Sequence, residues 1–211
     1  MKNSHRHLRL EKSIKNNIII NFFLIKMNKE NLNKQIIEGN LLSPLPVILV
    51  GANVHNKPNY LVIGYSCPFD FGKYIFFSLY PKRYTAIGVH ENMTFSVNIP
   101  SEDLLEKTKI CGSKSGRDID KSSLFDNFYG ELKTAPMIRE CAVNIECKVH
   151  EILDYGDGEG IIGKVIKSYV NQQYTFEEEG NIKLDWRKIH PIIWATGGDF
   201  NYYKLGERIN T

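Results

Sequence analysis

Two long strand-like segments joined by a three-residue turn stand out in the second half of the sequence. Residues 141–155 read CAVNIECKVHEILDY, residues 159–174 read EGIIGKVIKSYVNQQY, and GDG lies between them. Segments rich in Val and Ile on either side of a short Gly-containing turn are typical of a β-hairpin. The glycines of GDGEG superficially suggest a nucleotide-binding loop, but no helix pattern follows them. We therefore interpret them as the turn of a long hairpin.

Further strand-like segments surround this hairpin. They cover residues 44–54, 60–66, 73–80, 93–100 and 191–203, the last interrupted by the pair Gly197–Gly198. Residues 93–100 alternate between apolar and polar side chains, which predicts a strand. Ser101 is expected to cap a helix over residues 102–112. Many strands and few helices predict a mainly β fold, a closed or nearly closed barrel with a few helical excursions.

The distribution of charge argues against a nucleic-acid-binding protein. The chain has a formal net charge of +3, from 27 Lys and Arg residues and 24 acidic residues. Residues 1–30 hold seven of the basic residues and two of the acidic ones, so residues 31–211 keep 20 basic and 22 acidic side chains. A nucleic-acid binder would carry a broad basic face. We therefore expect no nucleic-acid partner.

The first thirty residues differ from the rest of the chain. An apolar run, residues 18–25, follows basic residues but is too short to span a bilayer, and no small-residue cleavage site follows it. We expect no membrane attachment. We predict that residues 1–30 are an extension, either a disordered or loosely docked arm or a segment upstream of the true start at Met27. Residues 31–211 are predicted to form one domain.

The cysteines and histidines do not form a metal-binding pattern. Cys67, Cys111, Cys141 and Cys147 include no CxxC pair, and no His pair completes a zinc site. We therefore predict no metal. Nothing resembles a disulfide framework either, which fits a reducing cytoplasm. Cys141 and Cys147 are expected to be buried free thiols on one face of a strand.

A basic segment follows the strand-like residues 73–80. Residues 80–92 read YPKRYTAIGVHEN, so two cations and Thr85 lie where a strand ends and a helix begins. Backbone N–H groups and the positive end of the dipole at a helix start favour an anion, and Lys82 and Arg83 would strengthen that preference. The segment predicts a phosphate-binding site.

A second basic loop covers residues 111–121, CGSKSGRDIDK. Its small residues let the backbone approach a ligand closely, and its hydroxyls and cations add donors and charge. Taken alone, it is better explained as a solvated loop after a helix, because Gly112 is a natural helix terminator. Two such loops in a body of net negative charge favour an anion site.

The order of these segments resembles that of a known family. The motifs that carry the resemblance are PLPVILVGANVHNKPNYLVIGYS, IFFSLYPKRYTAIGVHENMTFSVNIP, CGSKSGRDIDK, APMIRECAVNIECKV and FNYYKLGERI. From about Leu42 to Arg208 the chain is similar to the flavin reductase-like FMN-binding split barrels, especially the flavoredoxin branch. The resemblance implies a six-stranded Greek-key split barrel that holds FMN at its rim, usually as a homodimer.

The resemblance also implies which residues hold the flavin. They are Asn59, Ser66, Cys67, Lys82, Arg83, Thr85, Ser115, Gly116 and Lys121. Residue 59 opens the flavin-contacting strand, 66 and 67 reach the ring and ribityl chain, 82, 83 and 85 lie on the phosphate side, and 115, 116 and 121 belong to a loop that approaches the flavin. Many relatives carry other small residues at positions 67 and 68.

Simpler interpretations of single residues stay open. Asn59 would equally serve the preceding KPN turn. Cys67 is better explained as a packed thiol than as a redox partner, since no second cysteine is near it in sequence. Thr85 would cap the helix as well as bind phosphate, and Tyr84 is better explained as core or dimer surface than as a flavin-stacking ring.

The resemblance leaves three functions open. The first is an NADH- or NADPH-dependent flavin reductase that transfers hydride to flavin N5. In this reaction FMN carries the chemistry, and no acid–base pair of side chains is needed. The second is a flavoredoxin-like electron-transfer protein that holds FMN as a prosthetic group and exchanges electrons with a redox protein or small donor. The third is a non-catalytic dimeric barrel with two solvated basic loops.

Overall fold

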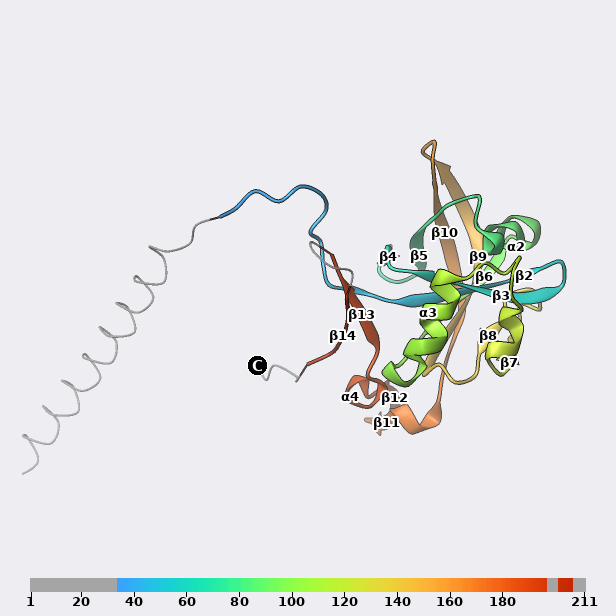
Figure 1. Ribbon diagram of the computed structural model, residues 1–211. Helices are drawn as coiled ribbons and strands as arrows, with labels where there is room; N and C mark the ends of the chain where they lie inside the picture. The colour runs from blue at the N-terminus through green and yellow to red at the C-terminus, as the bar shows by residue number, and fades with distance from the viewer. Residues whose placement is uncertain (1–33, 197–200, 207–211) are drawn as a thin grey trace, which may run out of the picture. The chain divides into compact units, whose positions relative to one another are not determined.

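The computed structural model describes residues 34–196 and 201–206 (Figure 1). Residues 40–211 belong to one compact unit. The predicted extension, residues 1–30, lies outside the described residues. No described helix combines the length and the apolar character needed to cross a membrane.

A seven-stranded antiparallel sheet forms the centre of this unit, in the order β3-β2-β6-β9-β10-β5-β4. The strands are β2 (Ile48–Val54), β3 (Lys57–Ile63), β4 (Ser66–Phe69), β5 (Tyr74–Leu79), β6 (Thr94–Ile99), β9 (Val143–Asp154) and β10 (Glu159–Val170). The predicted long hairpin is confirmed, since β9 and β10 pair along their length. Gly156, with a φ of 95°, occupies the left-handed region in its turn.

The sheet is curled, and one short connection joins its two edge strands. The edge strands β3 and β4 are consecutive in the chain and only Gly64 and Tyr65 separate them. The backbone N–H of Ser78 in β5 donates to the carbonyl of Tyr65, at 3.1 Å. Counted as one bent strand, β3 and β4 complete a barrel of six strands. The predicted mainly β barrel fold is therefore confirmed.

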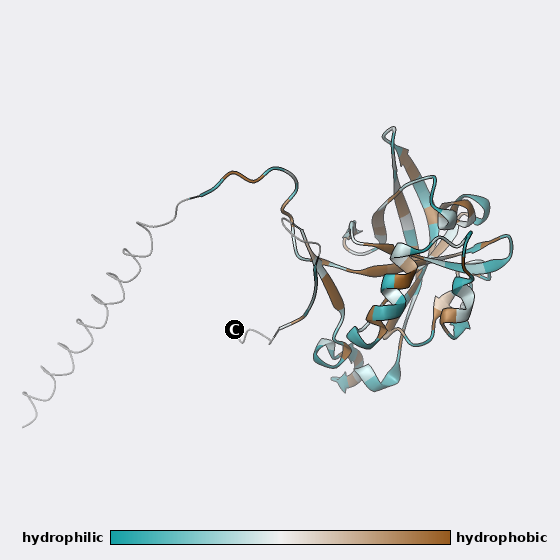
Figure 2. Cartoon of the chain, in the orientation of Figure 1, coloured by the Kyte–Doolittle hydropathy of each residue, from teal (hydrophilic) through white to brown (hydrophobic). Residues whose placement is uncertain are grey.

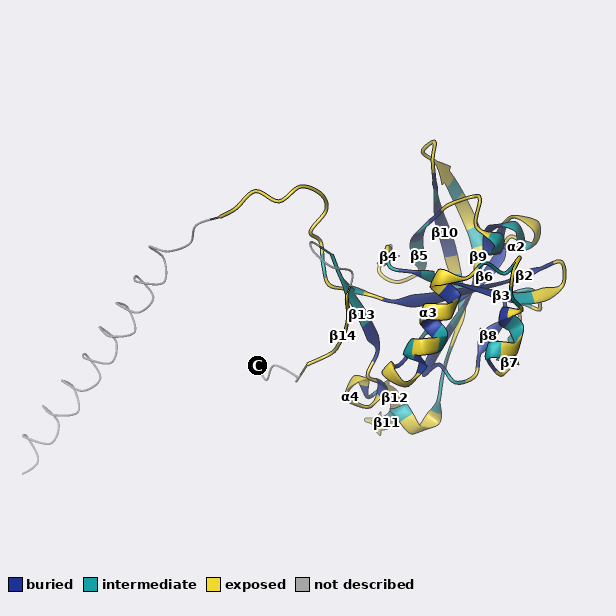
Figure 3. Ribbon diagram, in the orientation of Figure 1, coloured by how far each residue is buried: buried dark blue, intermediate teal, exposed yellow. Residues whose placement is uncertain are grey.

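The strands carry many hydrophobic residues (Figure 2), and those at alternate positions, such as Ile48, Val50 and Ala52 of β2, belong to the core of the barrel. Strand β2 is buried along its whole length (Figure 3). Phe77 and Phe95 meet edge to face at the centre, with ring centroids 5.0 Å apart. Gly163 lies at a register shift between β9 and β10, and a Cβ there would overlap the ring of Phe95. The glycine thus makes room for the largest side chains of the core.

Two helices and several short elements lie outside the barrel. Helix α2 (Tyr84–Asn92) packs on β2, and a short 3₁₀ turn, Glu102–Leu104, leads into α3 (Leu105–Ser113), which packs on β3. Ser101 is the N-cap residue of this 3₁₀ turn, as predicted, but its side chain does not cap it, because its hydroxyl donates to the carboxylate of Asp103. After α3 come a 3₁₀ turn (Lys121–Leu124) and the short strands β7 (Asn127–Phe128) and β8 (Met137–Ile138).

The remaining elements follow β10. A 3₁₀ turn (Gln172–Tyr174) precedes the hairpin of β11 (Thr175–Glu178) and β12 (Asn181–Leu184), and α4 (Trp186–Ile189) follows it. The predicted last strand, residues 191–203, is two paired strands, β13 (Ile192–Ala195) and β14 (Asn201–Lys204). Strand β1 (Leu45–Pro46) pairs with β13 and completes a three-stranded sheet.

Three of the four cysteines are buried and none forms a disulfide. Burial raises the pKa of the Cys147 thiol to about 12 and that of Cys111 to about 11. The prediction that Cys141 and Cys147 share a strand face is wrong. Cys141 precedes β9 and packs in a second apolar cluster with Tyr60 and Cys111, whereas Cys147 lies in the barrel core.

A buried carboxylate of β9 joins this strand to β10 and to the segment between β7 and β8. Glu146 is fully buried, and its carboxylate accepts hydrogen bonds from the N–H groups of Glu131 (3.1 Å) and Leu132 (2.8 Å) and from the hydroxyl of Tyr169 (2.7 Å). The Glu146→Ala variant would leave these donors unpaired. We expect a loss of about 3 kcal/mol in the free energy of unfolding, measured by urea titration.

The matched control is Glu151→Ala, which removes an exposed glutamate from the same strand. It should change the unfolding free energy by less than about 0.5 kcal/mol. Equal losses for the two variants would contradict the structural role assigned to Glu146.

Candidate functional site

A cavity of about 320 Å³ lies where three segments meet: β3, the start of α2 and the loop after α3. Seven of the predicted site residues line it, namely Asn59, Lys82, Arg83, Thr85, Ser115, Gly116 and Lys121. The structure therefore brings together the two basic segments, which lie about thirty residues apart in the sequence.

The first segment presents the start of α2 to this cavity. The N–H of Arg83 donates to the carbonyl of Tyr80 at 2.9 Å, which closes a turn around Pro81 and Lys82. Arg83 has extended backbone angles and is the N-terminal cap residue of α2, and no side chain caps the helix there. The first N–H groups of a helix have no partner within the helix. They are left to bind an anion.

Thr85 does not cap α2, so that prediction is wrong. Thr85 is already the second helical residue, and its hydroxyl oxygen accepts a hydrogen bond from Nδ2 of Asn59 at 2.7 Å. The hydroxyl hydrogen of Thr85 stays available as a donor. Asn59 lies within β3 and is buried, whereas the preceding turn is formed by His55 and Asn56, both with positive φ. Asn59 therefore ties β3 to α2 and does not serve the turn.

The loop after α3 lies directly against these residues. A Cβ on Gly116 would overlap both Oδ1 of Asn59 and the ring of Tyr84, so only glycine lets the loop approach this closely. Ser115 shapes the loop, because its hydroxyl accepts from the N–H of Arg117 at 3.1 Å and its carbonyl accepts from the N–H of Asp118 at 3.1 Å. The backbone of the loop thus forms one wall of the cavity.

The cavity carries an excess of positive charge. Lys82, Arg83 and Lys114 line it, and none of them pairs with a carboxylate among the described residues. Asp118 is the acidic residue of the lining. Unpaired cations beside the start of a helix are the arrangement that binds a phosphate or another anion.

Lys121 has a different role from these exposed cations. Its side chain is buried, and Nζ donates to the carbonyls of Tyr60 (3.0 Å) and Cys111 (2.8 Å). Burial lowers the pKa of its ammonium group, while the nearby Cys111 thiol raises it and Arg83 lowers it. Two of its three N–H donors therefore join β3 to α3, and one is left for a ligand.

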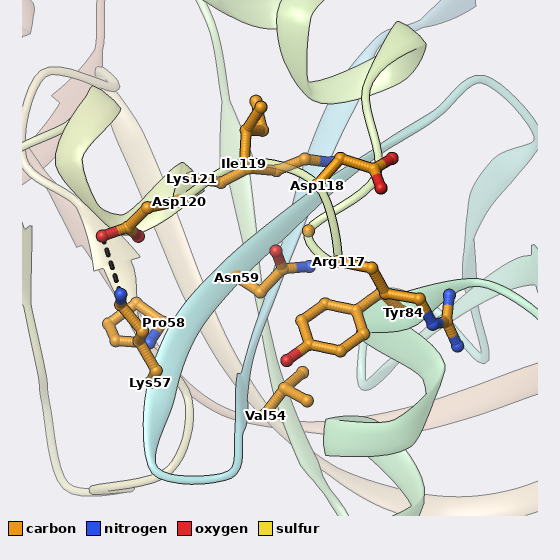
Figure 4. Close-up of a pocket in the computed structure, with 11 residues that line it drawn as sticks. Val54, Lys57, Pro58, Asn59, Tyr84, Arg117, Asp118, Ile119, Asp120 and Lys121 are labelled. Atoms are coloured by element: carbon orange, nitrogen blue, oxygen red, sulfur yellow. Dashed lines mark ion pairs between the residues drawn. The ribbon is translucent and has the colours of Figure 1, made fainter.

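A second cavity of about 300 Å³ adjoins the first and shares six lining residues with it, namely Asn59, Tyr84, Gly116, Arg117, Asp118 and Lys121. Figure 4 shows the Tyr84 ring and the Asn59 amide bordering this space, with the ion pair of Lys57 and Asp120 across from the ring. That pair, at 2.7 Å, lowers the pKa of Asp120 to about 2. Tyr84 lines both cavities, and whether its ring also lies at a dimer surface stays a prediction.

Ser66 and Cys67 lie apart from this group. They belong to β4 and line neither of the two cavities, and the Cys67 side chain is exposed. The other three cysteines are buried elsewhere in the unit. Contact of Ser66 and Cys67 with a flavin stays a prediction. In the described part of the chain, no group of three His, Cys, Asp or Glu residues could hold a metal.

The predicted flavin contacts do not include two residues that the structure places at the site, Tyr84 and Arg117. Both line both cavities. Tyr84 lies between two predicted site residues in the sequence, and Arg117 directly follows Gly116. Their neighbours could have drawn attention to them, but their contact with each other depends on the fold.

Comparison with known proteins yields one family. The sequence matches the family model of the flavin reductase-like domain over residues 41–199. A crystal structure of flavoredoxin from Methanosarcina acetivorans is similar at a TM-score of 0.77 and 38% identity, covering 85% of this chain and 95% of that one. The flavoredoxin of Desulfovibrio vulgaris gives 0.76 and 26%, over 85% and 97%.

Among curated sequences, an uncharacterised protein of Pyrococcus abyssi is 28% identical over 160 residues. The match covers 74% of this chain and 90% of the relative. The family match and the two structures together confirm the resemblance drawn from the motifs.

Proposed function

Since the chain belongs to the flavin reductase-like family, we propose that it is an FMN-binding flavoprotein with the phosphate in the cavity between residues 82–85 and 113–116. One observation carries the proposal. Lys82, Arg83 and Lys114, none of them paired with a carboxylate among the described residues, surround the uncapped start of α2. A phosphate monoester matches this donor set, since it offers several acceptor oxygens and a charge near −2.

The remaining residues of the group fit the rest of such a cofactor. The hydrogen bond to Thr85 holds the Asn59 side chain in place. Gly116 has no side chain, so the ligand could approach the backbone of this loop closely. Lys121 would direct its remaining N–H toward the ligand. Ser66 and Cys67 stay proposed contacts to the ring and ribityl chain. These roles agree with the fold, in which β3, α2 and the loop after α3 surround one space.

For the reaction, we propose an NADH- or NADPH-dependent flavin reductase. Bound FMN would supply the hydride-accepting chemistry, and the protein would supply binding and orientation. Lys82 and Arg83 would anchor the phosphate, and Asn59 and Gly116 would fix the adjoining part of the cofactor. We assign no side chain to acid–base catalysis.

A second candidate is a flavoredoxin-like electron-transfer protein that uses nicotinamide poorly. The likeness to the flavoredoxin of Methanosarcina acetivorans, at 38% identity over nearly its whole length, favours it. In this case a redox protein or small donor would reduce the flavin. The homodimer expected from the family is a further proposal and applies to both candidates.

The first test is the absorption spectrum of the purified protein. We expect a yellow protein, or binding of added FMN at about one flavin per chain with a shift of the visible bands. Under anaerobic conditions, fast bleaching by NADH or NADPH would support the reductase, and bleaching by dithionite alone would support the electron-transfer protein. FMN fluorescence unchanged by micromolar protein would leave only a non-catalytic barrel.

A further inference from the structure

Arg117 reaches from the loop after α3 to the segment before α2. Its Nη1 donates to the carbonyl of Lys82 at 3.2 Å, across 35 positions of sequence. Its guanidinium carbon lies 5.2 Å from the centroid of the Tyr84 ring. In the described part of the chain, Arg117 forms no ion pair with a carboxylate. Its contacts are therefore directed at the backbone and ring of the basic segment.

The carbonyl of Lys82 lies between two hydrogen-bonded structures. The turn before it closes on the carbonyl of Tyr80, and the first turn of α2 begins with the N–H of Ala86 bonded to the carbonyl of Arg83. Arg117 therefore holds the peptide group between Lys82 and Arg83. The direction of that peptide group governs where the two cationic side chains point.

Arg117 can hold this peptide group because contacts of the neighbouring residues fix the position of its own loop. Gly116 packs against Asn59 and Tyr84, and the hydroxyl of Ser115 accepts from the N–H of Arg117. A planar guanidinium can lie over a ring and donate to a carbonyl at the same time. An ammonium group, as in lysine, cannot reproduce that geometry.

We propose that Arg117 is a positioning residue that keeps Lys82 and Arg83 directed at the phosphate site, and so determines the preference for a phosphorylated flavin. The inference rests on the proposed function. It adds that the two basic segments act as one site because Arg117 connects them.

The test is a pair of titrations, with FMN and with riboflavin, on three variants. Arg117→Gln should weaken FMN binding about tenfold and riboflavin binding less than twofold, because riboflavin lacks the phosphate. Arg117→Lys keeps the charge but loses the planar fork, so it should remain about fivefold weaker than wild type for FMN. Melting temperatures would verify that each variant is folded.

Arg139→Gln is the matched control. Arg139 also lies over an aromatic ring, Phe128, at 5.1 Å, and it lines neither cavity. Its removal should leave the ratio of the two affinities unchanged. A general loss of surface charge or of a cation–ring contact would affect Arg139→Gln as well.

Several results would overturn the inference. Full recovery of FMN affinity in Arg117→Lys would show that the charge alone matters. Equal losses for FMN and riboflavin would show a structural role, and no loss in Arg117→Gln would show no role in binding. If the wild-type protein bound neither flavin, the proposed function would fail first and this inference with it.

Discussion

The Lys82→Ala/Arg83→Ala double variant is expected to bind FMN ten- to a hundredfold more weakly than wild type, with riboflavin binding nearly unchanged. A well-formed charge-assisted contact to a phosphate is worth about 1.5–3 kcal/mol, and about 1.4 kcal/mol corresponds to tenfold in affinity, so the net loss of one such contact gives this range. Both residues line the cavity and neither has a carboxylate partner among the described residues. Parallel fluorescence titrations with the two flavins would measure the difference.

The control is Lys148→Ala/Lys164→Ala. These two exposed lysines occupy opposite positions on the neighbouring strands β9 and β10, and they line neither cavity. The variant therefore loses the same charge away from the site. Added salt should weaken FMN binding more than riboflavin binding in wild type, and this difference should shrink in the Lys82/Arg83 variant. Equal losses of both flavins would mean that the two cations support the fold or the ring site.

Much of the barrel could be predicted from local sequence. Two local signals predicted strands of the sheet. The alternation in residues 93–100 corresponds to β6, and the two Val- and Ile-rich segments on either side of the GDG turn correspond to β9 and β10. The closure of the barrel could not be predicted in this way. It depends on the bend at Gly64 and Tyr65, which moves the chain from one edge of the sheet to the other.

The two segments that form the site could be predicted from their residue composition. Two segments with cations and small residues were identified, and the structure places them around one cavity. The partners of single side chains were not predictable. The hydroxyl of Thr85 binds Asn59 instead of its own helix, and Lys121 binds two carbonyls instead of facing solvent. Those contacts join residues 10 to 61 positions apart, so only the fold decides them.

The Gly116→Ala variant should lose FMN binding about a hundredfold, because its loop could no longer lie against Asn59 and Tyr84. A Cβ at this position would overlap both residues. Either the loop withdraws and takes Ser115 and Arg117 with it, or Asn59 turns away from Thr85. Each change removes two or more polar contacts from the proposed site, which corresponds to about 3 kcal/mol.

Gly112→Ala supplies the matched control, four residues earlier. There a Cβ would meet only Val62, at 3.4 Å, and the residue lies within α3. An alanine in a helix is favoured over glycine by about 0.5–1 kcal/mol, so this variant should bind FMN normally and melt at an equal or higher temperature. Normal FMN binding by a folded Gly116→Ala protein would show that the close approach of the loop to Asn59 does not build the phosphate site.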